Sequence, residues 1–180
     1  MPNSEFSWIR TIFYVLLCIY SLQFFTFDVN ADVMNAFIHG PNLIFHEAGH
    51  VIFWFFGDFI RILGGSLFQC LLPFLLALVF FIKEEDGFAA AVCFWWFGQN
   101  LTDVALYISD ARARSLPLIG GMSEDAHDWG NLLTMTNTLQ YDHTFAILTH
   151  YTGMIVMLFA LIYWGYVIWN SYVFSRSISV

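Results

Sequence analysis

The sequence predicts an all-α, polytopic membrane protein with about five transmembrane helices and a short re-entrant or interfacial element. Of the 180 residues, 59% are hydrophobic and only 11% are charged, whereas soluble domains carry about 25% charged residues. The apolar residues gather into stretches of up to about 20, the length of helix that crosses a hydrocarbon core of about 30 Å. We therefore expect one membrane-embedded domain over residues 1–180.

The spans and connections can be read along the chain. Five stretches are apolar enough to be spans: residues 7–27, 43–56, 67–82, 88–108 and 144–169. The polar segment 28–39 predicts an amphipathic helix at the interface, and Asn42 is the expected N-cap of the second span. Residues 59–66 are too few to span and predict an extended or re-entrant piece. A loop at 111–126 leads into a short helix expected over residues 127–142.

The charge pattern predicts location and excludes one class of partner. A net charge of −8 with only six Lys and Arg argues against nucleic acid, because phosphate binding needs clustered cations. With the five spans above, Arg10, Arg61, Arg112 and Arg114 fall on one side of the membrane and Glu84–Asp86 on the other. The positive-inside rule then predicts a cytoplasmic N-terminus, and we expect a multi-pass protein of a bacterial inner (cytoplasmic) membrane.

The second span carries the order His46-Glu47-x-x-His50. On an α-helix the i, i+4 spacing places both imidazoles on one face, where they can bind one metal ion, and the adjacent Glu47 can reach a water on that ion. Three ionisable groups within five residues of an apolar helix cost several kcal/mol unless something compensates them. A divalent cation would compensate all three, whereas the alternative is a chance group of buried polar residues.

Two histidines leave a catalytic zinc site incomplete, because such sites usually have three protein ligands and a water. The candidates for the third ligand are Asp103, His127, Asp128, His143 and His150. In the fourth span, positions 103, 107 and 110 share one helical face. That polar face is expected either to line the site or to form a hydrogen-bond network that ties helices together.

These residues resemble the site-2 protease family of intramembrane zinc metallopeptidases over about residues 40–135. The resemblance covers the His46–His50 helix, Gly64–Gly65, the next two spans, and His127-Asp128-Trp129-Gly130, which is similar to the family's Leu-Asp-Gly segment with a tryptophan in place of glycine. It implies Zn²⁺ bound by His46, His50 and either Asp128 or His127, the other member of that pair orienting its neighbour. Asp103 is the reserve ligand, and Glu47 is the catalytic base.

The function that this resemblance implies is hydrolysis of a peptide bond within or near the membrane, in a transmembrane protein substrate. We expect Gln99, Asn100 or backbone near Gly64–Gly65 to hold the oxyanion. The alternative is a non-proteolytic, zinc-binding subunit of a larger membrane complex, which the short chain and its high aromatic content of 20% favour.

Overall fold

The computed structural model describes residues 8–29, 31–116 and 126–178, which form helices and turns without a strand. The α-helices of this described part are α1 (Trp8–Ser21), α2 (His39–Ile52), α3 (Asp58–Ile82), α4 (Gly87–Ser109), α5 (Asp128–Met135) and α6 (Asp142–Ile178). Short 3₁₀ turns lie between them: η1 (Leu22–Phe24), η2 (Ala31–Asn35), η3 (Trp54–Phe56) and η6 (Leu139–Tyr141). The predicted all-α class is confirmed for these residues.

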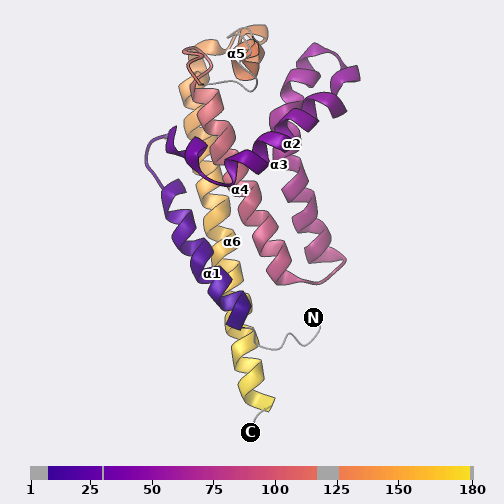
Figure 1. Cartoon of the computed structure of the whole chain (residues 1–180), viewed down its shortest axis with the longest axis vertical. Helices are drawn as coiled ribbons and strands as arrows, with labels where there is room; N and C mark the ends of the chain where they lie inside the picture. The colour runs from indigo at the N-terminus through magenta and orange to yellow at the C-terminus, as the bar shows by residue number, and fades with distance from the viewer. Residues whose placement is uncertain (1–7, 30, 117–125, 179–180) are drawn as a thin grey trace.

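Four helices run along the molecule and one crosses it. Figure 1 shows α1, α3, α4 and α6 roughly parallel to the long axis, with α2 oblique to them and α5 at the end where α4 finishes and α6 starts. By length and composition, two described stretches could cross a membrane, namely Asp58–Ile82 and Leu139–Ser177. The arrangement with about five spans stays a prediction.

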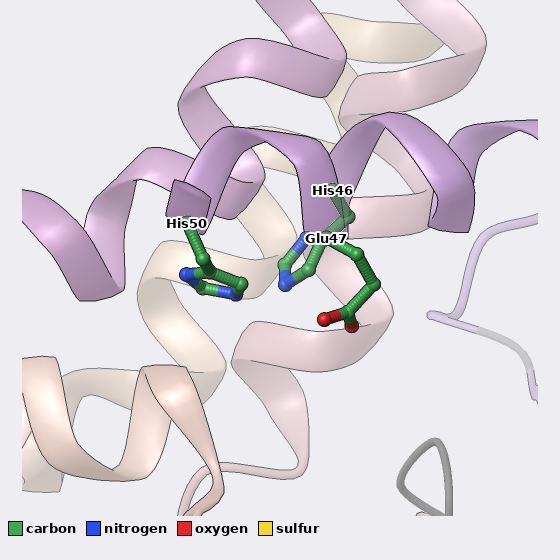
Figure 2. A group of neighbouring side chains, drawn as sticks. All are labelled: His46, Glu47 and His50. Atoms are coloured by element: carbon green, nitrogen blue, oxygen red, sulfur yellow. The ribbon is translucent and has the colours of Figure 1, made fainter. Parts of the chain in front are cut away.

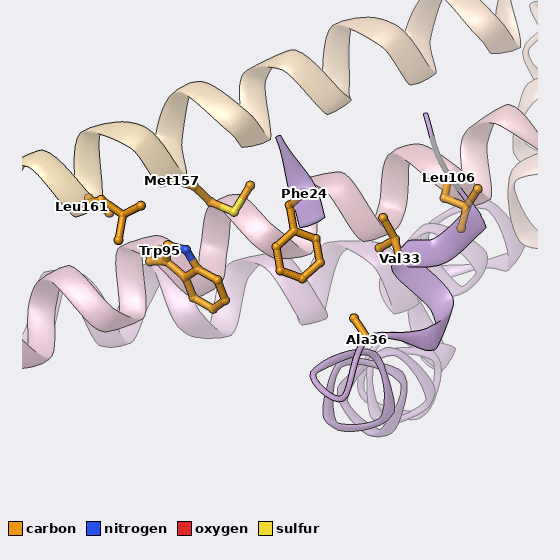
Figure 3. Packing of buried hydrophobic residues seen from close by; sticks show 8 residues of the cluster. Phe24, Val33, Ala36, Trp95, Leu106, Met157 and Leu161 are labelled. Carbon is orange, nitrogen blue, oxygen red and sulfur yellow. The ribbon is translucent and has the colours of Figure 1, made fainter. Parts of the chain in front are cut away.

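The α4–α6 pair is the most extensively packed part of the bundle. A Cβ atom added to Gly98 of α4 would lie 2.8 Å from the carbonyl oxygen of Gly153 on α6, so the two backbones are almost in contact, as small residues permit in helix pairs. Trp95 and Met157 lie next to this crossing, and Phe24 of the turn η1 packs against them (Figure 3). This core holds α4 in place beside the polar site described below.

The re-entrant piece predicted at 59–66 is wrong, because residues 58–82 form one unbroken helix. A Cβ atom on Gly64 would lie 2.9 Å from the carbonyl oxygen of Gly49, which means that α2 and α3 cross at these glycines. A helix satisfies its own backbone polar groups in apolar surroundings, whereas an extended segment would need partners. The glycine pair is therefore a helix-crossing point and not a chain break.

The predicted boundaries also change around α2. Asn42 is not an N-cap, since the helix begins at His39 and the Asn42 side chain is buried against α4. The helix ends at Ile52, so its 14 residues are about 21 Å long, less than a hydrocarbon core. The interfacial helix predicted at 28–39 is only the turn η2 among the residues described.

The last helices differ from prediction in length. α5 stops at Met135, because Thr136 closes it and a 3₁₀ turn follows, while α6 runs from Asp142 to Ile178. Residues 117–125 of the predicted loop lie outside the described residues.

The predicted separation of charges is wrong at one point. Arg10 Nη2 lies 3.9 Å from Asp86 Oδ2, so the first helix starts at the same end of the bundle as the turn between α3 and α4. The reason is that α2 crosses the bundle obliquely and does not traverse it (Figure 1). The six cations then divide equally, with Arg61, Arg112 and Arg114 at the α5 end and Arg10, Lys83 and Arg176 at the other.

Candidate metal centre

Helix α2 presents the two motif histidines and Glu47 on one side. Figure 2 shows both imidazoles and the carboxylate pointing the same way from the helix, and one ligand atom from each lies within 4.8 Å of the others. His46 is buried and His50 is half-buried. The i, i+4 geometry expected from the sequence is thus present in the structure.

Asp128, the first residue of α5, brings a carboxylate to these histidines. Its Oδ2 lies 2.8 Å from His46 Nε2 and 3.2 Å from His50 Nε2. Three atoms from two segments about 80 residues apart in sequence therefore meet at one point. Of the candidates for a third ligand, Asp128 is the residue that the structure brings to both imidazoles.

The hydrogen bonds made by the Nδ1 atoms of His46 and His50 determine that the Nε2 atoms face Asp128. His46 Nδ1 lies 2.7 Å from Gln69 Oε1, and His50 Nδ1 lies 2.8 Å from the carbonyl oxygen of Arg61. A carbonyl oxygen only accepts, so each Nδ1 carries the hydrogen and each neutral ring has its lone pair on Nε2. Gln69 is oriented in turn by donating from Nε2 to Asn100 Oδ1 over 3.1 Å.

Two Nε2 lone pairs and a carboxylate oxygen cannot meet without a positive charge between them. Burial raises the pKa of Asp128, but hydrogen bonds from His46 and then His50 outweigh this effect, so the pKa lies below its ordinary value. A cation at this point would leave both Nδ1 hydrogen bonds intact, an arrangement typical of metal-bound histidines.

The spacing suits a tetrahedral ion after a small adjustment. Zinc–nitrogen and zinc–oxygen bonds of about 2.0–2.1 Å separate neighbouring ligand atoms by about 3.3 Å. The 3.2 Å distance from His50 Nε2 to Asp128 already agrees, and the 2.8 Å distance from His46 Nε2 must open by about 0.5 Å.

Gly65 of α3 supplies the room for this centre. A Cβ atom at that position would lie 2.6 Å from His46 Nε2 and 2.7 Å from His50 Nε2. Any side chain would therefore fill the space next to the two nitrogens that face Asp128. The residues present fit a zinc ion held by His46, His50 and Asp128.

A cavity of about 430 Å³ opens at the centre. Its wall includes all three candidate ligands together with Glu47 and Tyr107. The Glu47 carboxylate makes no hydrogen bond or ion pair within the described part of the chain, so it is available to a substrate or a water. Most of the remaining wall is apolar: Met34, Leu43, Ile62, Val104, Leu106, Leu116 and Ala126.

His127 lies next to the centre but its ring is used elsewhere. Its Nδ1 accepts from the backbone N–H of Gly130 over 3.0 Å as the N-cap of α5, and its Nε2 donates to Asp110 Oδ2 over 3.2 Å. Burial lowers the pKa of His127, and the Asp110 carboxylate offsets this only in part. His127 thereby orients the start of α5, from which Asp128 reaches the site.

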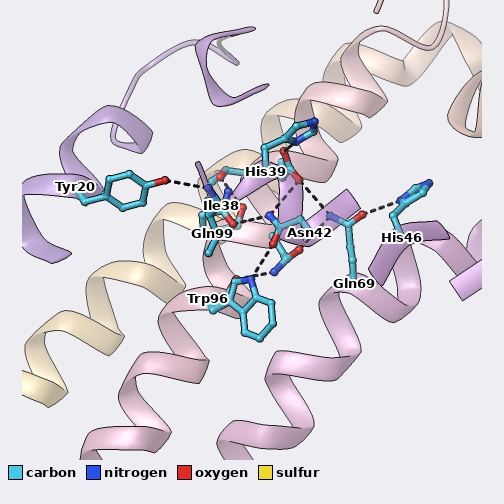
Figure 4. A network of polar contacts seen from close by, with 11 residues as sticks. Tyr20, Ile38, His39, Asn42, His46, Gln69, Trp96 and Gln99 are labelled. Atoms are coloured by element: carbon cyan, nitrogen blue, oxygen red, sulfur yellow. Dashed lines mark hydrogen bonds and ion pairs between the residues drawn. The ribbon is translucent and has the colours of Figure 1, made fainter. Parts of the chain in front are cut away.

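Asp103, the reserve ligand, lies one layer behind the imidazoles. Its Oδ1 is 2.7 Å from His39 Nδ1, and its Oδ2 accepts from Asn42 Nδ2 over 3.2 Å. Figure 4 shows this network continuing through Gln69 to His46. The polar face of α4 thus both ties α2, α3 and α4 together and supports the centre.

The remaining predicted site residues lie away from the imidazoles. His143 is exposed, and His150 Nε2 donates to the carbonyl oxygen of Thr26 over 2.9 Å. Gln99 and Asn100 belong to the network behind the site, where Gln99 Oε1 accepts from Asn42 over 2.8 Å; neither lines the cavity.

Sequence reasoning gave no site role to Gln69 or Tyr107 individually, and it considered Gly65 only as part of the Gly64–Gly65 backbone that could hold the oxyanion. A glutamine inside an apolar span was a signal for Gln69, since intramembrane polar residues generally face partners. Tyr107 lay on the polar face 103/107/110. The carbonyl oxygen of Arg61 had no sequence signal, because every residue carries one.

Comparisons of the chain with protein-family models, with curated proteins and with solved structures find no match. The likeness to site-2 proteases therefore stays a prediction drawn from the motif residues themselves.

Proposed function

We propose that this chain is an intramembrane zinc metallopeptidase that hydrolyses a peptide bond in or near the bilayer. The observation that supports it best is the meeting of His46 Nε2, His50 Nε2 and Asp128 Oδ2 above Gly65, with Glu47 in the same cavity. A hydrogen-bond network that only ties helices together explains why histidines are buried. It does not explain why the Nε2 lone pairs of both histidines point at the Asp128 carboxylate, next to a glutamate that has no partner among the described residues.

Hydrolysis would proceed with Glu47 as the proton carrier. A zinc ion held by His46, His50 and Asp128 would supply Lewis acidity, which lowers the pKa of a water and polarises the scissile carbonyl. Glu47 takes a proton from the attacking water while the water oxygen bonds to the carbonyl carbon and the carbonyl π pair moves onto oxygen. When the C–N bond breaks, its electron pair stays on nitrogen, which receives the proton from Glu47. The acid product then passes a proton to the amine.

The membrane arrangement that we propose is a multi-pass protein of a bacterial cytoplasmic membrane. α1, α3, α4 and α6 would cross the bilayer, one helix fewer than the sequence predicted, because α2 is short and oblique. The centre would then lie near one membrane surface, at the α5 end of the bundle, where water can reach it. Because the six cations divide equally between the two ends of the bundle, the positive-inside rule does not favour either orientation. The proposed cytoplasmic N-terminus is tested by labelling single cysteines placed at each end.

Zinc analysis and turnover test the function together. Purified wild type is expected to hold one zinc per chain, His46→Ala to lose it, and His143→Ala, at an exposed site on α6, to retain it. Glu47→Gln is expected to keep the metal and lose hydrolysis by a factor of about 10²–10⁴. Wild type that holds zinc but cleaves no peptide would support the zinc-binding membrane subunit instead, and zinc retained by His46→Ala would refute the centre itself.

A further inference from the structure

We propose that the Tyr107 hydroxyl donates the hydrogen bond that stabilises the oxyanion during hydrolysis at this centre. The inference rests on the proposed peptidase function and assigns a role for which the sequence had suggested Gln99, Asn100 or backbone at Gly64–Gly65. Those amides lie in the network behind the site, and the two glycines lie within the regular helix α3. The oxyanion donor must therefore come from elsewhere on the cavity wall.

Tyr107 lies between the candidate ligand His46 and His127, the residue that precedes the candidate ligand Asp128. Its ring centroid is 5.8 Å from that of His46 and 4.4 Å from that of His127. Its hydroxyl oxygen accepts a hydrogen bond from the backbone N–H of Asp128 over 3.1 Å. The phenol is thus held at the residue whose carboxylate meets the imidazoles, on the cavity wall that also carries Glu47.

The hydroxyl hydrogen of Tyr107 is available. The bond with Asp128 uses an oxygen lone pair, and among the described residues the O–H has no acceptor. Two other donors on the wall already have acceptors, since Gln69 donates to Asn100 over 3.1 Å and one guanidinium nitrogen of Arg61 donates to Asp58 over 3.2 Å. The O–H rotates about the C–O bond, so it can turn toward an acceptor in the cavity that Tyr107 lines.

The step that this hydrogen bond assists is the addition of water to the carbonyl. The oxygen that receives the carbonyl π pair becomes negatively charged, and the Tyr107 O–H donates to it without giving up its proton. The bond weakens again when the C–N bond breaks and the carbonyl re-forms. A donor that interacts more strongly with the adduct than with the substrate raises kcat more than it changes KM.

Tyr107→Phe removes the hydroxyl and keeps the ring contacts. Tyr20→Phe is the matched control, because the Tyr20 hydroxyl also accepts a backbone N–H, that of Ile38 over 3.3 Å, but Tyr20 does not line the cavity. The assay is cleavage of a pool of quenched-fluorescence transmembrane peptides in detergent micelles. We expect Tyr107→Phe to lower kcat by about 10²–10³ with KM changed less than about two-fold, and Tyr20→Phe to match wild type.

Two readouts separate catalysis from positioning. Zinc content and zinc affinity of Tyr107→Phe are expected to equal those of wild type, while the affinity for a phosphinic peptide, which mimics the tetrahedral adduct, falls in proportion to kcat/KM. Loss of zinc by Tyr107→Phe would show that the phenol only holds Asp128, and unchanged kcat would show that it donates nothing; either result overturns the inference while leaving the peptidase intact. A zinc-loaded wild type without turnover overturns the proposed function, and this inference with it.

Discussion

Gly65→Ala tests whether the space between the two imidazoles and α3 is a metal site. The added Cβ atom would lie 2.6 Å from His46 Nε2 and 2.7 Å from His50 Nε2, about 0.8–0.9 Å closer than an ordinary contact of about 3.5 Å. The ring tips must therefore withdraw from the point that they share with Asp128. Overpacking of this kind costs about 1–3 kcal/mol, which corresponds to zinc binding weaker by about 5- to 150-fold when the cost falls on the bound state.

The measurement is zinc competition with a chromophoric chelator in detergent, together with the Tm of each protein. Gly40→Ala is the control, because it lies on the same helix as the histidines and a Cβ atom there meets nothing within 4 Å. Its zinc affinity is expected to equal that of wild type. Wild-type affinity and Tm in Gly65→Ala would refute the reasoning, since the imidazole nitrogens then could not converge above that residue.

Two further predictions concern residues around the ligands. Gln69→Leu removes the acceptor of the His46 Nδ1 hydrogen and should weaken zinc binding by about 10- to 100-fold in the same competition assay; equal affinity would show that Gln69 does not orient the ring. The lowered pKa of His127 predicts that stability depends on pH. The unfolded chain takes up a proton at His127 more readily than the folded chain does. The contribution of neutral His127 to the free energy of unfolding is therefore complete above about pH 6.5 and declines as the pH falls below that value. His127→Asn retains an N-cap acceptor for Gly130 and cannot titrate, so its Tm should drop less than that of wild type between about pH 7.5 and 5.5; parallel Tm curves would contradict this assignment.

The part of the site that could be predicted is the part within one helix. The spacing of His46 and His50 sets their common face as soon as the segment is helical, and both rings do point to one side of α2. The third partner was left open between several residues because Asp128 lies on another helix. Its approach depends on how α5 docks, which in turn depends on the His127 bonds to Gly130 and Asp110.

Two errors have the same physical origin. Residues 59–66 predicted an extended or re-entrant piece because they are too few to span. The low helix propensity of Gly64 and Gly65, about 1 kcal/mol per glycine, would also favour a break, yet the close crossing with Gly49 requires residues without a Cβ. Asn42 is a good N-cap by local preference, but Gln99, Trp96 and Asp103 occupy its side chain. In both cases contacts with another helix outweigh a local preference of about 1 kcal/mol.

By itself, the sequence determined the helical class and the pairing of two imidazoles with a glutamate on one helical face, because each of these follows from composition or from spacing along one segment. Only the tertiary structure decided that Asp128 meets those imidazoles, that Gln69 and the Arg61 carbonyl orient their lone pairs, and that Tyr107 stands on the cavity wall. These depend on where separate helices cross, and the crossing is set by glycines whose effect appears only when two backbones come together.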